Sequence, residues 1–297
     1  MQCNKCGNEA IFFQHYSGQH LCKRHFVMDV EAKAKRSIRT HHWLRSGDQI
    51  AVAVSGDYPS SALLSFFKKL SADRRDIRII AITIDEGADS CDDPAQIVEF
   101  SESLGIPCIC GSFIEELGVT AADITGGKGR ANTYRHHRAL RSCVMTRIAL
   151  RNGITRIALG FTLDKGAQGV LMNFLTGDVR CLLKKGCTNQ GKIPWISPFI
   201  AIPLDEIRLY AELNGAGTDF PLCPDDRSAI QKEILSMLDR YDQHHPATKY
   251  ALMNLGEQLC SPGVTPVTIL PFCYQTDPCD CLCEECRLIR EVTENAA

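Results

Sequence analysis

One stretch of the chain, residues 49–70, constrains the fold more than any other. It opens with the apolar run QIAVAV, typical of a buried strand, and ends with ALLSFFKKL, which has helical periodicity. Between the two lies the polar turn SGDYPSS. A strand that enters a helix through a Ser/Gly turn points backbone N–H groups and the positive end of the helix dipole at one place. The stretch therefore predicts an anion-binding turn at the edge of an α/β sheet.

Apolar runs alternate with helical stretches through the middle of the chain. Further strands are expected at 77–84, 106–109 and 155–159. Helices are expected at 31–45, 94–104, 133–152 and 163–175, with a loop or short helix within 111–129. This alternation predicts a doubly wound parallel sheet. Because ligands bind where the strands of such a sheet end, the segments 55–61, 85–87 and 160–164 are expected to form one cleft.

Composition and charge narrow the class of protein. The 297 residues, 44% of them hydrophobic, suffice for one large core with small appended modules. The sequence has no apolar run of about 18 residues and no signal core at its N-terminus, so we expect a cytoplasmic protein without membrane contact. A net charge of −2 argues against a broadly basic nucleic-acid-binding body and leaves room for local basic patches.

Of the 16 cysteines, three lie near the N-terminus and five lie close together near the C-terminus. Near the N-terminus, Cys3-x2-Cys6 is followed by Cys22-x2-His25. Zinc takes four such sulfur and nitrogen ligands, and a two-residue gap lets each pair bind from one turn. In a reducing compartment this spacing favours a metal over disulfides, so a structural zinc site is predicted. Chance pairing of cysteines is the alternative.

A second structural zinc site is predicted near the C-terminus. Cys283-x2-Cys286 is one ligand pair, and its partners lie among Cys273, Cys279 and Cys281. The predicted zinc ligands are Cys273, Cys281, Cys283 and Cys286. A labile thiol cluster is the alternative. Both terminal modules are too small to bury a core, so metal binding is expected to contribute to their folding.

The order of these features resembles one family over nearly the full length of the chain. That family is the tRNA 2-thiolation proteins of archaea and the eukaryotic cytosol, within the PP-loop superfamily of N-type ATP pyrophosphatases. It has Cys-x2-Cys and Cys-x2-His at its N-terminus and then Val-Ala-Val-Ser-Gly, matched here by residues 52–56. Its Gly-His-Asn-Leu-Asp-Asp-Glu-Ala corresponds to GFTLDKGA at 160–167, and its late cysteine to Cys223. The family also has a C-terminal zinc module, which corresponds to the zinc site predicted here near the C-terminus.

The resemblance implies a two-step reaction, in which ATP activates the C2 oxygen of a tRNA uridine and sulfur then replaces that oxygen. It implies ATP with Mg²⁺ as a cosubstrate and tRNA as a partner. If the chain is an enzyme of this kind, Cys223 is the candidate catalytic thiol that carries the sulfur. The positions that match the family's nucleotide contacts are Ala53, Ser55, Gly56, Ser60, Gly160 and Asp164. From the residues alone, Ser55 and Ser60 can equally be helix caps, and Asp164 can cap the helix that follows it.

The loop departs from the family pattern. Where the family reads Ser-Gly-Gly-x-Asp-Ser, Asp57 replaces the second Gly and Pro59 replaces the Asp. Lys165 and Gly166 replace two acidic residues that can support a metal. Asp57 puts a negative charge where a triphosphate needs close approach to neutral backbone. The departures leave open whether catalysis survives.

The family's iron–sulfur ligands are also changed. In the family a Cys-x2-Cys pair and the late cysteine hold the cluster, and the pair falls here near Tyr134 and His137. One remaining thiolate, Cys223, cannot hold a conventional cluster, so no iron–sulfur cluster is expected.

Two basic helical stretches are candidate tRNA contacts. Arginine side chains on a helix face suit RNA phosphates, and a solvated helix face is the alternative. The candidate residues are Arg36, Arg39, Arg130, Arg135 and Arg138.

The sequence predicts five parts. These are an N-terminal zinc module at 1–30, a basic linker helix at 31–48, a PP-loop-like α/β domain at 49–225, a helical extension at 226–268 and a C-terminal zinc module at 269–297. Two functions stay open: an enzyme of tRNA thiolation, and a non-catalytic tRNA-binding or scaffold subunit beside an active paralogue. A different PP-loop reaction on another substrate is a third alternative. A sulfur-carrier protein is a further expected partner, and both a homodimer and a heterodimer stay open.

Overall fold

The computed structural model describes residues 1–87, 93–119, 130–177, 193–215 and 229–259, with the backbone alone at 130–136, 138 and 229. Its strands are β1 Phe12–Gln14, β2 Gln19–Leu21, β3 Gln49–Ala53, β4 Arg78–Asp85, β5 Cys108–Ser112, β6 Arg156–Ala158 and β7 Trp195–Ile196. Its helices are α1 Lys23–Thr40, α2 Tyr58–Asp73, α3 Pro94–Ser103, α4 Phe113–Leu117, α6 Arg130–Arg151, α7 Leu163–Leu175, α9 Leu204–Leu213, α10 Ala229–Asp242 and α11 Thr248–Leu259.

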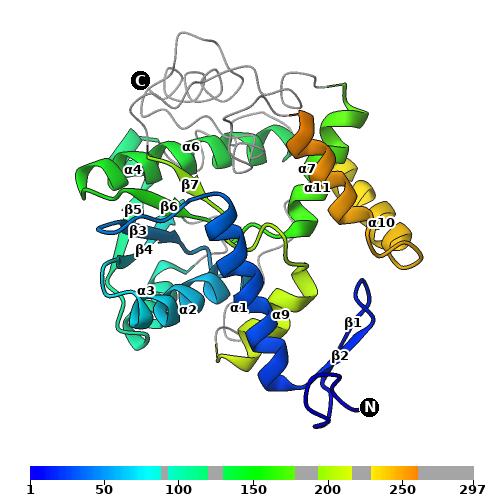
Figure 1. The fold of residues 1–297 in the computed structure, drawn as a ribbon. Coiled ribbons are helices and arrows are strands. Elements are labelled where there is room, and N and C mark those ends of the chain that lie inside the picture. Colours follow the sequence, from blue (N-terminus) through cyan, green and yellow to red (C-terminus); the bar gives the residue numbers. More distant parts are fainter. Residues whose placement is uncertain (88–92, 120–129, 178–192, 216–228, 260–297) are drawn as a thin grey trace.

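Within the described ranges, five strands form one parallel sheet in the order β5-β4-β3-β6-β7. The middle strand β3 pairs with β4, where Gln49 lies opposite Arg78, and with β6, where Ile50 lies opposite Arg156. Helices α2 and α3 cover one face of the sheet, and α6 covers the other (Figure 1). The predicted doubly wound α/β fold is therefore confirmed.

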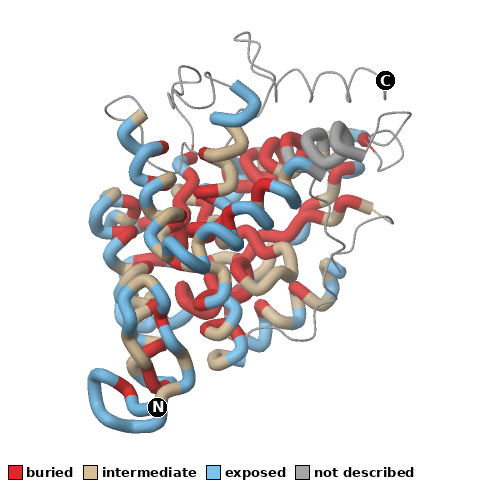
Figure 2. Tube along the Cα trace, turned by 90° about the vertical axis from the view of Figure 1, so that its right-hand side faces the viewer, coloured by how far each residue is buried: buried red, intermediate tan, exposed pale blue. Residues whose placement is uncertain are grey.

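The core lies in this sheet and on the helix faces turned toward it (Figure 2). In β3, Ile50, Ala51 and Val52 are fully buried. A strand covered on both faces has to be apolar throughout, which is why the run QIAVAV does not alternate with polar residues. Among the described residues, no helix is both long and apolar enough to cross a membrane.

Three sequence-based expectations about the elements were wrong or incomplete. The basic helix ends at Thr40 and not at residue 45, and it begins already at Lys23, inside the N-terminal module. The strand expected at 106–109 is β5, which continues to Ser112 because it stays paired with β4 as far as Asp85. Two elements were not expected from the sequence: β7, which is only two residues long, and α9.

Helix α2 begins four residues earlier than expected, at Tyr58. Asp57 is its N-cap, and the Asp57 carboxylate accepts the N–H of Ser60 at 2.9 Å. Pro59 lies in the first turn, where a backbone N–H has no partner within the helix, so the missing donor does not weaken the helix.

A buried polar network attaches the β1–β2 hairpin to the rest of the protein. Its centre is Glu206 of α9, whose side chain is 1% exposed. The Glu206 carboxylate accepts hydrogen bonds from Gln14 Nε2 at 3.1 Å and Tyr16 Oη at 2.6 Å, and it pairs with Lys33 of α1 at 2.7 Å. The Tyr16 ring also lies 5.2 Å from the ring of Tyr250 in α11. Burial raises the pKa of Glu206, against the opposing charge of Lys33.

Replacing Glu206 with alanine should lower the free energy of unfolding by about 3 kcal/mol, because the Lys33 ammonium and two further donors lose a buried acceptor. Urea titration followed by tryptophan fluorescence measures the change. Glu212→Ala, at an exposed position of the same helix, is the control and should stay within about 0.5 kcal/mol of the unchanged protein. Equal stability of the two variants would contradict the role of the network.

Candidate functional site

Three loops meet at one edge of the parallel sheet. They follow β3, β4 and β6, which are neighbours in the order β4-β3-β6. Parallel strands end on the same side, so the segments 55–61, 85–87 and 160–164 lie along one edge. This is the edge at which the sequence predicted a ligand cleft.

The loop after β3 is closed by its own hydrogen bonds. Gly56 takes a positive φ of 73°, a conformation that favours glycine. The N–H of Ser55 donates to Ser60 Oγ at 3.2 Å, and Ser60 Oγ donates to the carbonyl of Asp57 at 3.1 Å. The same carbonyl accepts the N–H of Ser61 at 3.1 Å. Ser55 and Ser60 therefore shape the loop, and their predicted nucleotide contacts stay predictions.

Gly160 lies directly against this loop. A Cβ at Gly160 would lie 2.6 Å from the backbone of both Pro59 and Ser60, closer than such contacts occur. Only glycine therefore lets the chain after β6 approach the start of α2. Ala53, the last residue of β3, is buried directly before the loop.

An ion pair joins the loop after β3 to the start of α7. Lys165 Nζ lies 3.5 Å from Asp57 Oδ2, and both side chains are roughly half exposed. Desolvation raises the pKa of Asp57, but the charge of Lys165 and the Ser60 hydrogen bonds outweigh it, so the pKa lies below its usual value. Asp57 is therefore held as a carboxylate at the positive end of α2.

The carboxylate of Asp164 is used twice within the protein. Its Oδ2 accepts the N–H of Leu204 at 2.6 Å, and its Oδ1 accepts a hydrogen bond from Lys249 of α11 at 2.6 Å. Asp164 thus caps α9 and not the helix α7 in which it lies. Its predicted nucleotide contact stays a prediction.

Glu86 follows β4 and is buried at the same edge. His137 Nδ1 lies 2.8 Å from Glu86 Oε2, and Arg141 Nε donates to Glu86 Oε1. Burial raises the pKa of Glu86, but the charge of Arg141 and the hydrogen bonds from His137 and Arg141 outweigh it, so the pKa lies below its usual value. His137, which falls near the expected cysteine pair, is thus engaged by a carboxylate.

The four N-terminal candidate ligands lie together. The Sγ atoms of Cys3, Cys6 and Cys22 and a ring nitrogen of His25 are all within 4.8 Å of one another. Cys3 Sγ and Cys22 Sγ each lie 3.4 Å from His25 Nδ1, and Cys6 Sγ lies 3.6 Å from Cys22 Sγ. Ligand atoms about 2.3 Å from a tetrahedral zinc ion are about 3.8 Å apart, so the donor set and its spacing fit zinc.

Local structure explains how these ligands converge. Gly7, with a φ of 74°, closes the first knuckle by donating its N–H to the Cys3 carbonyl at 2.9 Å. Cys22 is the N-cap residue of α1, and His25 lies in its first turn. Desolvation raises the pKa of the Cys3 thiol, but hydrogen bonds from the backbone of Cys22 and Lys5 lower it to about 6, which favours the metal-binding thiolate.

The candidate tRNA contacts are placed only in part. Arg36 and Arg39 are exposed on α1. The candidates Arg130, Arg135 and Arg138 belong to α6, of which the structure describes the backbone at these positions. The candidates that lie outside the described residues are Cys223, Cys273, Cys281, Cys283 and Cys286.

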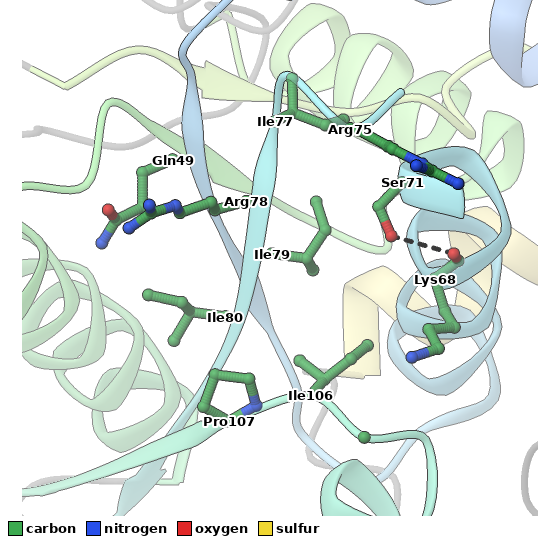
Figure 3. Close-up of a pocket in the computed structure, with 11 residues that line it drawn as sticks. Gln49, Lys68, Ser71, Arg75, Ile77, Arg78, Ile79, Ile80, Ile106 and Pro107 are labelled. Atoms are coloured by element: carbon green, nitrogen blue, oxygen red, sulfur yellow. Dashed lines mark hydrogen bonds between the residues drawn. The ribbon is translucent and has the colours of Figure 1, made fainter. Parts of the chain in front are cut away.

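A solvent-exposed hollow lies at the opposite, amino edge of the sheet (Figure 3). It has a volume of about 590 Å³ and is lined by Lys68, Arg75 and Arg78 together with apolar residues such as Ile80. Ligands of doubly wound sheets bind at the carboxyl edge, so this hollow is not the candidate site.

Sequence reasoning missed the partners of the charged groups at the site. It treated Lys165 as a lost acidic residue and did not consider Lys249. These lysines pair with carboxylates 108 and 85 positions away in the chain. No local pattern reveals such a pair. The simultaneous appearance of Asp57 and Lys165 at two positions of the expected cleft was the available signal.

Comparison with known families gives two matches. Residues 2–27 match the N-terminal LIM domain of the 2-thiouridine synthetase TtuA, and residues 28–218 match the PP-loop domain. The predicted family resemblance is thereby confirmed.

Individual relatives agree with these matches. The tRNA 2-thiolation protein NcsA of Haloferax volcanii is 28% identical over 98% of this chain and 99% of its own length. Cytoplasmic tRNA 2-thiolation protein 1 of Drosophila ananassae is 28% identical over 86% of this chain and 77% of its own length. A solved structure, the U34-tRNA thiolase NcsA from Methanococcus maripaludis with its 4Fe–4S cluster, has a TM-score of 0.78 at 26% identity, with 87% of each chain covered.

Replacing Cys6 with serine should lower the metal content by one ion per chain, because a serine hydroxyl is a poor substitute for a thiolate ligand. Mass spectrometry of the metal content of the purified protein measures this. Cys110→Ser, at an exposed cysteine of β5, is the control and should retain the full content. Unchanged metal in Cys6→Ser would contradict the N-terminal site.

Glu86→Gln should reduce stability at neutral pH by about 2 kcal/mol and flatten its loss in acid. The pKa of Glu86 is lower in the folded protein than its ordinary value of 4.5, so its contribution is present above that pH and is lost as pH falls below it. Urea midpoints at pH 7 and pH 3.5 (roughly one unit below that value) measure the difference. The control is Glu99→Gln, at an exposed position. If the two variants have the same urea midpoints at both pH values, the interactions of the Glu86 carboxylate contribute nothing to stability.

Proposed function

This chain belongs to the PP-loop domain family, and from that premise we propose that it functions in the 2-thiolation of tRNA, in the cytoplasm. The observation that carries the proposal is the pairing of two modules in one chain. A Cys/His cluster with zinc-like geometry precedes a PP-loop domain, and the buried Glu206 network fixes the one to the other. Relatives named for tRNA 2-thiolation match both parts, one of them over 98% of this chain.

We assign the N-terminal cluster to a structural zinc ion held by Cys3, Cys6, Cys22 and His25. Its four ligands leave no open position, which is the pattern of a structural and not a catalytic site. We assign a second zinc ion to Cys273, Cys281, Cys283 and Cys286, which rests on their spacing in the sequence alone. Because the ligand set is closed, we propose that this ion holds the N-terminal module together and takes no part in a reaction.

The geometry favours the non-catalytic version of this function, a tRNA-binding subunit beside an active paralogue. The solved thiolase carries a 4Fe–4S cluster. In this chain His137, near the expected cysteine pair, pairs with Glu86, which also accepts a hydrogen bond from Arg141. Among the described residues, a paired carboxylate therefore lies there in place of the expected thiolates. We therefore propose that this chain holds no iron–sulfur cluster and leaves sulfur transfer to its partner.

The enzymatic version gives defined roles to the chain's own residues. The turn at 55–61 would bind the nucleotide phosphates with Mg²⁺, and Cys223 would carry sulfur to the activated uridine. A sulfur-carrier protein would then be the partner that supplies sulfur. Pyrophosphate release from ATP in the presence of tRNA distinguishes the two versions, since only the enzyme produces it.

The tRNA contacts are assigned to Arg36 and Arg39 on α1 and to Arg130, Arg135 and Arg138 on α6. Arg36 and Arg39 are exposed, three positions apart on one helix, so both can reach the phosphates of one RNA strand.

Arg36→Glu/Arg39→Glu should weaken tRNA binding at least tenfold and reduce its dependence on salt, because two phosphate contacts are lost. Filter binding of unmodified tRNA at several salt concentrations measures both effects. A matched charge reversal, Arg75→Glu/Arg78→Glu at the amino-edge hollow, is the control and should keep wild-type affinity.

Two results would overturn the proposal. If the intact chain does not bind tRNA, the proposed function is wrong. If both double variants lose affinity equally, α1 is not the contact surface and the effect is one of net charge. Release of pyrophosphate by the chain without a partner would select the enzymatic version.

A further inference from the structure

We propose that Asp57 and Lys165 determine which ligand the loop after β3 accepts: the Asp57 carboxylate takes the anion position at the start of α2, Lys165 holds it there, and the loop excludes polyphosphates. This inference concerns the specificity of the loop and does not depend on tRNA binding. It also explains why ATP does not fit the described residues in the way that the family resemblance implies.

Three of the loop's backbone hydrogen-bond donors are already in use. The N–H groups of Ser55, Ser60 and Ser61 donate to Ser60 Oγ, Asp57 Oδ1 and the Asp57 carbonyl, respectively. A phosphate that took these donors would have to displace acceptors that belong to the protein. Asp57 therefore supplies, within the chain, the negative oxygen that an anion-binding turn would otherwise take from a ligand.

Charge adds to this exclusion. A phosphate at the loop would lie within a few ångströms of the Asp57 carboxylate, where two negative charges repel each other. Lys165 is a cation that could offset the charge, but its ammonium already lies 3.5 Å from Asp57 Oδ2. The ion pair thus occupies the counter-charge that a polyphosphate needs.

The rest of the loop is built to keep its shape. Gly160 approaches the backbone of Pro59 and Ser60 so closely that no side chain fits between them. Gly56 supplies the positive φ at which the chain turns. Because these features do not depend on the charge of residue 57, removing that charge should remove the repulsion toward an anion and leave the loop intact.

The test replaces Asp57 with asparagine, which caps a helix as well as aspartate but carries no charge. Calorimetry with inorganic pyrophosphate and the full chain measures the affinity. Asp57→Asn should bind pyrophosphate about 100-fold more tightly than the unchanged protein, because the repulsion is gone and Lys165 becomes available to the ligand. Asp57→Ser, a second substitution that keeps a capping oxygen, should gain affinity as well.

Two controls identify the cause. Asp57→Asn/Lys165→Ala should lose most of the gained affinity, because the ligand then has no cation. Asp73→Asn, which removes an exposed carboxylate from the other end of α2, should leave pyrophosphate affinity unchanged. Melting temperatures establish that each variant is folded before its affinity is compared.

Three outcomes would overturn the inference. The first is tight pyrophosphate binding by the unchanged protein. The second is a folded Asp57→Asn and a folded Asp57→Ser that both bind no more tightly than it does. The third is an equal gain in Asp73→Asn, which would make the effect one of net charge. These readouts are independent of the tRNA-binding assay, so failure here leaves the proposed function standing, and the reverse also holds.

Discussion

The parallel pairing of β3 with β4 and β6 is the constraint on which the rest of the structure depends. Each strand of the ladder runs in the same direction, so the segments that follow them have to meet at one edge. The buried, continuously apolar β3 fixes this arrangement because neither of its faces can turn to water. The candidate site is therefore a consequence of strand order, before any side chain is considered.

At that edge the charged side chains neutralise one another. Asp57 pairs with Lys165, Glu86 with His137 and Arg141, and the buried Asp164 with Lys249. Carboxylates that are paired and hydrogen-bonded within the protein are stable in place, and for the same reason they are not available to a ligand or a metal. The edge thus has the strand order of a ligand-binding α/β sheet, while its carboxylates serve to join segments of the protein. This pairing is the basis on which we propose the non-catalytic version of the function.

Much of this could be predicted from the sequence. The strand at β3, the helix α7 and the Cys/His ligand set depend on local patterns: apolar runs, helical periodicity and two-residue gaps. The start of α2 was misplaced because Asp57 was judged as a change in a ligand loop, whereas in the fold it is first of all a helix cap. The pairs Lys165–Asp57, Lys249–Asp164 and Lys33–Glu206 could not be predicted, since the two residues of each pair lie 85 or more positions apart in the chain.

The sequence by itself determined the class of fold, the metal-ligand spacing near the N-terminus and the membership of a family, because these depend on residue type and short-range spacing. Only the tertiary structure decided what the altered residues do. It brought Asp57 to Lys165, used Asp164 to cap α9, and made Gly160 a point of backbone contact with α2. The physical reason is that charge pairing and close packing act between segments that are distant in the chain, and their strength depends on distance and burial that no linear pattern contains.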